Sequence, residues 1–259
     1  VITVREVLDK ASKNLDDEKN TLKQQPLIEA DLRTTIGDIY QLLGLIPLSI
    51  VHLEKALALH KTHKGDEHKY YKLLRALSNS YNRTDQFDKQ LPMLEEAVEL
   101  SKKLYGENSS RTLGMMSNLA GLYNDTGKSQ QALELHHYIY AKAQSELGDK
   151  ELVTILAITS LGADYHTLGD YVQAEHFYRL GLKLSTASLG AKHGLTRYNL
   201  SRLSGLLEAL GQYSAAKEFS SQFLTITTET LGEKHQDTIE AKYLVANLYM
   251  AEGQLEQAE

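Results

Sequence analysis

Residues 119–132 read LAGLYNDTGKSQQA, and the same pattern of residue types returns at 161–174 as LGADYHTLGDYVQA and at 203–216 as LSGLLEALGQYSAA. Each copy begins with an aliphatic and a small residue. A large apolar residue, a glycine and a final alanine follow at fixed spacings, and successive copies start 42 residues apart. Such internal repetition is typical of helical repeat proteins, in which one unit cannot bury its own apolar face and must stack on its neighbours.

The repeat extends over most of the chain. Its large apolar position is occupied in turn by Tyr40, Tyr81, Tyr123, Tyr165, Leu207 and Tyr249. Four residues later stand Gly44, Asp85, Gly127, Gly169, Gly211 and Gly253, so that only the second repeat lacks the glycine. A second series consists of Gly65, Gly106, Gly148, Gly190 and Gly232. Because glycine adopts the left-handed conformation that ends a helix, each series predicts a turn after a helix.

Apolar residues at spacings of three, four and seven predict two helices in each repeat, and the small residues predict close packing between them. The first helices of the hairpins, called A helices below, are predicted near 29–43, 69–83, 110–125, 152–167, 194–209 and 236–251. The second helices, called B helices, are predicted near 46–63, 87–104, 129–146, 171–188 and 213–230. Pro92 suggests a kink in the second B helix.

The first 28 residues do not follow the repeat, and we expect an N-terminal capping helix and linker over residues 1–28. The predicted solenoid then occupies residues 29–259, with repeats near 29–68, 69–109, 110–151, 152–193, 194–235 and a truncated 236–259. Because the chain starts at Val1 and stops inside the pattern at Glu259, we expect a fragment of a longer protein.

The combined pattern of small residue, Tyr, Gly and Ala resembles the tetratricopeptide repeat (TPR). Its 42-residue period is similar to the kinesin-light-chain-like subclass, and residues 231–235, LGEKH, match that subclass's Leu-Gly-acidic-x-His turn. The resemblance implies an all-α fold: a right-handed superhelical solenoid of about six antiparallel helix hairpins behind the N-terminal capping helix. It also implies that the A helices line a concave groove that binds a peptide or a partner protein.

A second resemblance concerns the N-terminal stretch from Thr3 to Gly44. It is similar to segments beside the kinase domain of some bacterial TPR-containing serine/threonine kinases, and it rests on residues 3–9, TVREVLD, and 37–40, GDIY. This resemblance implies an alternative role as a regulatory or sensor domain of a larger signalling protein.

Helical spacing separates outward-facing positions of the A helices from core positions. These outward positions and their neighbours give the predicted peptide-binding residues Arg75, Asn79, Asn82, Ser117, Asn118, Asn124, His166 and Arg202. Asparagine forms helices poorly, but its amide both donates and accepts hydrogen bonds, which suits a peptide backbone. Arginine pairs with carboxylates and phosphates. The alternative for each residue is an ordinary exposed polar position.

Small residues also follow this outward line at Gly121, Ala163 and Gly205. They either leave room for the backbone of a ligand or serve helix packing, and the sequence leaves both explanations open.

Composition argues against several other functions. The net charge is −6 without a basic cluster, so nucleic acid is not an expected partner. No apolar run approaches the roughly 20 residues needed to cross a bilayer, so no membrane is expected either. Self-association through the terminal repeats is an alternative. No cysteine is present, which removes disulfides and thiolate sites and fits a cytoplasmic protein. The spacing of the histidines and carboxylates predicts no metal site, no cofactor and no catalytic residues, so we expect a scaffold and not an enzyme.

Overall fold

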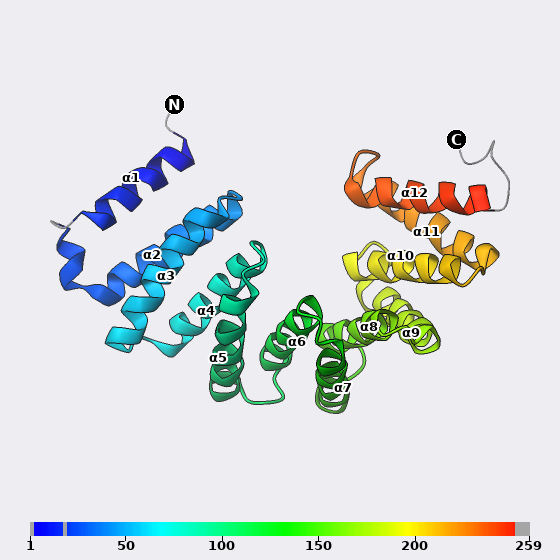
Figure 1. Cartoon of the computed structure of the whole chain (residues 1–259), viewed down its shortest axis with the longest axis horizontal. Helices are drawn as coiled ribbons and strands as arrows, with labels where there is room; N and C mark the ends of the chain where they lie inside the picture. Colours follow the sequence, from blue (N-terminus) through cyan, green and yellow to red (C-terminus); the bar gives the residue numbers. More distant parts are fainter. Residues whose placement is uncertain (1–2, 18–19, 252–259) are drawn as a thin grey trace. The chain divides into compact units, whose positions relative to one another are not determined.

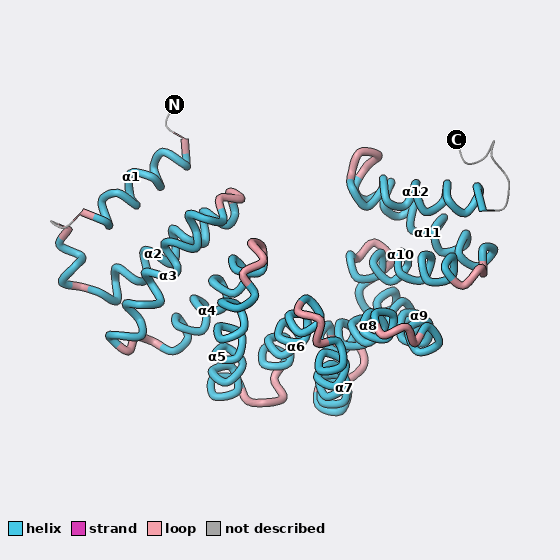
Figure 2. Tube along the Cα trace, viewed as in Figure 1, coloured by secondary structure: helices cyan, strands magenta, loops and turns pink. Residues whose placement is uncertain are grey.

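The structure of the protein is a computed structural model that describes residues 3–17 and 20–251. The described residues form helices joined by short loops, and none of them lies in a strand (Figure 2). Within the described residues, most of the contacts between helices join helices that are adjacent in the chain, as in a tetratricopeptide-type solenoid. The predicted all-α solenoid class is therefore confirmed.

The hairpins follow the predicted order along the chain (Figure 1). The A helices are α2 (Pro26–Leu42), α4 (Glu67–Asn82), α6 (Ser110–Asp125), α8 (Leu152–Thr167), α10 (Gly194–Ala209) and α12 (Gln236–Ala251). The B helices are α3 (Ile46–His63), α5 (Phe87–Tyr105), α7 (Ser129–Glu146), α9 (Tyr171–Leu189) and α11 (Tyr213–Leu231). Helix α2 begins three residues before its predicted start because Pro26, with its fixed backbone angle, suits a first helical turn.

Before the repeats lie helix α1 (Val4–Asp16) and the short 3-10 helix η1 (Thr21–Gln24). A capping box starts α1: the Thr3 hydroxyl accepts from the amide of Glu6, and the Glu6 carboxylate accepts from the amide of Thr3. Leu8 and Leu15 of α1 pack against Ile36 and Tyr40 of α2.

The turns between A and B helices have the predicted backbone. Gly127 and Gly169 have φ angles of 75° and 80°, and Asp85 adopts the same region with φ 53°. In the other glycine series the prediction for Gly65 was wrong, because the left-handed residue after α3 is Lys64, with φ 48°. Gly65 instead packs so closely on His60 that a Cβ atom would lie 2.6 Å from the imidazole Nδ1. Gly253 lies outside the described residues.

The chain divides into two compact units, Val1–Leu122 and Tyr123–Glu259, called the first and second unit below. Helix α5 in the first unit runs from Phe87 to Tyr105 with Pro92 inside it. In the second unit, Ala174 and Tyr178 of α9 pack against Leu203 and Leu206 of α10. The predicted division into residues 1–28 and 29–259 stays a prediction.

Candidate functional site on the A helices

In the first unit, three of the predicted residues form a row on helix α4. Arg75, Asn79 and Asn82 are all exposed, and their spacing places them on one helix face. The Arg75 guanidinium lies over the Tyr71 ring at 5.7 Å from its centroid. The row therefore presents one cation and two amides to solvent.

Helix α6 carries two further predicted residues in the first unit. Asn118 is exposed, and its amide nitrogen lies 4.0 Å from the Met115 sulfur, which is at most a weak contact. Ser117 is half-buried.

In the second unit, a cleft of about 280 Å³ lies between the A helices α10 and α12. Its polar lining consists of Arg197, Tyr198, Ser201, Arg202, Asp237 and Glu240. Two of these residues form a hydrogen bond with each other: the Ser201 hydroxyl donates to the Glu240 carboxylate at 2.6 Å. Arg197 is also engaged: one terminal nitrogen lies 3.5 Å from the Asp237 carboxylate and the other donates to the Lys192 carbonyl at 2.8 Å.

Arg202 differs from Arg197, because no carboxylate of the described chain lies within 4.0 Å of it. Its guanidinium stacks over the exposed ring of Tyr198, 4.8 Å from the centroid. An arginine held over an aromatic ring can still direct its N–H donors to a carboxylate in bidentate geometry. The cleft therefore offers one unpaired cation next to two carboxylates.

Two of the small residues predicted along the A helices have no packing role. A Cβ atom built on Gly121 of α6, or on Gly205 of α10, meets no heavy atom within 4 Å. Glycine inside a helix is unfavourable by roughly 0.5–1 kcal/mol relative to alanine. Of the two explanations left open by the sequence, close packing is thus excluded for these two positions, and open space for a ligand remains.

Gly205→Ala is expected to stabilise the protein by about 0.5–1 kcal/mol, since alanine forms helices better and the added methyl meets nothing. Gly162→Ala in α8 is the comparison variant, for which we expect a loss of stability. There the new Cβ would lie 2.6 Å from Cδ1 of the buried Tyr178 ring, and such overpacking costs about 1–3 kcal/mol. Urea unfolding followed by circular dichroism measures the change in the free energy of unfolding for both variants. A change of the same sign in the two variants would contradict the conclusion that Gly205 has open space beside it.

The remaining predicted residues of the second unit lie in different surroundings. His166 is exposed at the end of α8, with its ring 5.6 Å from that of Tyr171 across the turn. Asn124 is half-buried, and its amide nitrogen donates to the Asp164 carboxylate at 2.6 Å. The structure thus accounts for Asn124 through an internal contact, without a ligand.

Asp164 is the residue that sequence reasoning missed. Its carboxylate accepts from Asn124 and lies 2.6 Å from Nδ1 of His136, and the side chains of Asp164 and His136 are only 1% and 4% exposed. The signal was present in the repeat: the positions equivalent to Asp164 are Leu122 and Leu206, which are buried leucines. A carboxylate at a core position predicts a buried polar partner.

No group of three or more histidine and carboxylate side chains in residues 3–17 and 20–251 is placed to hold a metal ion. In the same residues, every helix is too short or too polar to cross a membrane.

Comparison with known protein families gives matches to tetratricopeptide repeat models at residues 73–110, 111–187 and 154–226. These matches together span residues 73–226 of the 259. No curated protein matches the sequence.

Three solved structures illustrate the likeness in fold. A candidate kinesin light chain of Podospora anserina with nearly identical TPR-like repeats is 22% identical, with TM-score 0.61 over 71% of this chain and 88% of that one. A signal transduction ATPase with numerous domains from Pyrococcus horikoshii, which has a tetratricopeptide repeat sensor, is 18% identical, with TM-score 0.69 over 99% of this chain and 40% of that one. A Rap protein complexed with Competence and Sporulation Factor is 16% identical, with TM-score 0.64 over 90% and 72%. At these identities the likeness establishes the fold.

Proposed function

The chain belongs to the tetratricopeptide repeat family, and we propose that it is a protein-interaction scaffold that binds a peptide segment of a partner on its A helices. The observation that carries the proposal is Arg202, a cation that lines the α10–α12 cleft, lies over the Tyr198 ring and has no carboxylate partner among the described residues. Repeats of this family generally serve as non-catalytic scaffolds, which supports a binding role and not an enzymatic one.

The lining of the cleft defines the chemistry of the proposed ligand. Arg202 would take a carboxylate, either an acidic side chain or the C-terminus of a peptide, through two parallel hydrogen bonds. The carboxylates of Glu240 and Asp237 can accept from backbone amides or from a cationic side chain of the same ligand. Gly205, one turn along α10, leaves open space for the ligand backbone. An extended peptide with one acidic group fits these features.

In the first unit, the row on α4 supplies a second set of proposed contacts. The exposed amides of Asn79 and Asn82 can each donate to and accept from a peptide backbone, and Arg75 adds a cation. Because both asparagines are exposed, Asn79→Ala with Asn82→Ala is not expected to unfold the protein.

Selection of binders from a random-peptide display library tests the proposal, followed by calorimetric titration of the best peptide. We expect Arg202→Gln to weaken this peptide by about tenfold or more, since a charge-assisted hydrogen bond contributes about 1.5–3 kcal/mol. Arg179→Gln is the matched control, because Arg179 is an exposed arginine on B helix α9. Equal affinity for the Arg202→Gln variant and the wild type would overturn the proposal.

A second candidate function is a sensor or regulatory domain within a larger signalling protein. It is favoured by the Pyrococcus horikoshii ATPase, a protein with a tetratricopeptide repeat sensor, because 40% of that chain aligns with 99% of this one. The fold also accommodates a bound factor, as the Rap complex with Competence and Sporulation Factor illustrates. A peptide-dependent change in the activity of a catalytic domain in the intact protein would support this role. The kinase link, the cytoplasmic location and self-association stay predictions.

A further inference from the structure

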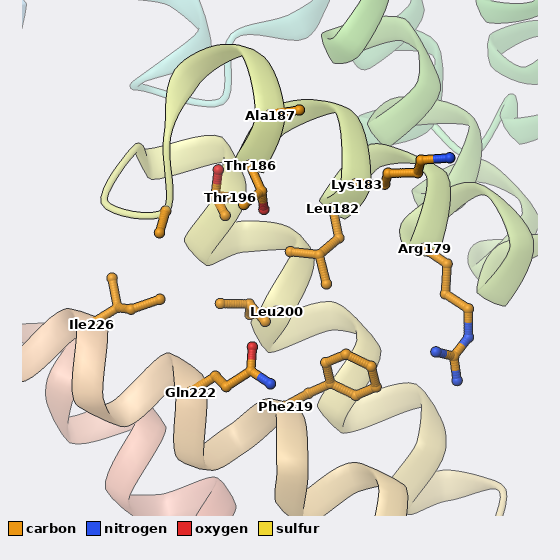
Figure 3. A pocket seen from close by; sticks show the side chains of 11 residues that line it. Arg179, Leu182, Lys183, Thr186, Ala187, Thr196, Leu200, Phe219, Gln222 and Ile226 are labelled. Carbon is orange, nitrogen blue, oxygen red and sulfur yellow. The ribbon is translucent and has the colours of Figure 1, made fainter.

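A second cleft of the second unit lies between B helices α9 and α11 and has a volume of about 480 Å³ (Figure 3). It is distinct from the α10–α12 cleft, and no predicted peptide-binding residue lines it. Volumes of about 300–1,000 Å³ are typical of sites for small organic ligands.

The walls of this cleft are mainly apolar. Leu182 of α9, Leu200 of α10 and Phe219 and Ile226 of α11 face the same space in Figure 3. Leu200 is fully buried, whereas Leu182, Phe219 and Ile226 are half-buried, so apolar surface remains accessible. Thr186, Thr196 and Gln222 provide the uncharged polar groups of the lining.

The charges of the cleft are one-sided. Its lining contains Arg179 and Lys183 but no aspartate or glutamate, although the whole chain carries a net charge of −6. In Figure 3 both cations leave α9 on the side of the cleft opposite Ile226; Arg179 extends towards the level of Phe219, whereas Lys183 extends in a different direction, away from the apolar lining. The Arg179 guanidinium lies 5.3 Å from the centroid of that ring.

Both cations keep donors available for a ligand. Arg179 contacts the Glu175 carboxylate through Nε at 2.7 Å, and its terminal nitrogens have no carboxylate partner in the part of the chain that the structure describes. No carboxylate of the described chain lies within 4.0 Å of Lys183. A planar carboxylate matches the two terminal nitrogens of an arginine, and a lysine on the same helix adds positive charge to that side of the cleft.

We propose that the α9–α11 cleft binds a small amphiphile that has one carboxylate and an aliphatic body. The carboxylate lies at the terminal nitrogens of Arg179, Lys183 adds positive charge on the same side of the cleft, and the aliphatic body covers Leu182, Leu200, Phe219 and Ile226. The apolar body supplies most of the free energy of binding through burial, and the cations select the ionised head group. This site acts independently of peptide binding on the A helices.

The absence of tryptophan from the chain provides a specific test, because Phe219→Trp places a single fluorescent reporter in the cleft. Decanoate is titrated below its micellar concentration. We expect a saturable change in the indole emission of this reporter variant, and about tenfold weaker binding when Arg179→Gln and Lys183→Gln are added to it. Decanol, which has the same chain without the charge, is expected to bind about tenfold more weakly than decanoate.

Arg202→Gln on the reporter background is the matched control and is expected to leave decanoate affinity unchanged. Circular dichroism establishes that each variant folds. The proposal is overturned if decanoate gives no saturable signal, if decanol binds as well as decanoate, or if removal of both cations leaves the affinity unchanged. Saturation of the reporter by an acidic peptide but not by decanoate would also contradict it.

Discussion

Replacement of Asp164 by alanine is expected to lower the free energy of unfolding by about 3–5 kcal/mol, because it removes the acceptor shared by two groups of a buried hydrogen-bonded network. Asp164 holds Asn124 and His136 together, with both hydrogen-bond distances at 2.6 Å. Alanine would leave the imidazole and the amide in the core of the second unit without their acceptor. Urea unfolding followed by circular dichroism gives the size of the effect.

Hydrogen exchange of the amides of α7 and α8 localises this effect to the second unit. Asp125→Ala is the matched control: Asp125 is exposed at the end of α6, next to Asn124, and its loss is expected to cost less than about 0.5 kcal/mol. The combined change Asp164→Leu with His136→Leu should recover part of the lost stability, since well-packed apolar residues often replace a buried polar pair without loss. A cost for Asp164→Ala as small as that of the control would refute the importance of this network.

Arg33→Ala is expected to destabilise the first unit by a similar amount, about 3–5 kcal/mol. The Arg33 side chain is only 2% exposed and donates through Nε to Glu29 at 2.7 Å. Its Nη2 donates to the Asp16 carboxylate at 2.9 Å and to the Leu15 carbonyl at 3.1 Å, which attaches α1 to α2. The hydrogen bond from Lys55 lowers the pKa of Asp16 against the effect of burial, so that this acceptor stays charged.

Without Arg33, Lys23, at 3.4 Å, would be the remaining cationic partner of the buried Glu29 among the described residues. Arg33→Lys is not expected to rescue stability, because an ammonium cannot reproduce the planar fork that reaches Glu29 and Asp16 together. Arg5→Ala is the control, since Arg5 and Asp9 form an exposed pair at 3.7 Å that contributes about 0.5 kcal/mol at most. Loss of exchange protection in α1 should accompany Arg33→Ala; an unchanged α1 would contradict the proposed attachment.

Most helix boundaries could be predicted from the sequence, because the repeat places a turn residue at the same point of each unit. Gly127 and Gly169 confirm this, and Asp85 shows that aspartate can occupy the same conformation in the second repeat. The error at Gly65 arises because helix α3 ends at His63, so that the residue directly after the helix is Lys64, and Lys64 takes the left-handed conformation. Periodicity specifies where a helix ends only to within a residue or two.

The surface was less predictable than the fold. Spacing placed Arg75, Asn79 and Asn82 on one exposed face, but it could not show that Asn124 contacts Asp164, because that contact joins residues 40 positions apart. The sequence also could not predict that the α9–α11 cleft is lined by cations and no carboxylates, because its lining residues come from three helices. Repeat patterns identify residues that face inward or outward, whereas side-chain pairing between helices depends on the packed structure.

A double-mutant cycle between Arg202 and the carboxylate of a selected peptide tests most directly whether the A helices bind an acidic peptide. Titrations of wild type and Arg202→Gln, each with the peptide and with its amide counterpart, give the coupling free energy. We expect a coupling of about 1.5 kcal/mol or more, as measured for close charge pairs in other complexes. A coupling near zero, with the peptide still bound, would show that Arg202 does not contact the carboxylate and would contradict the proposed site.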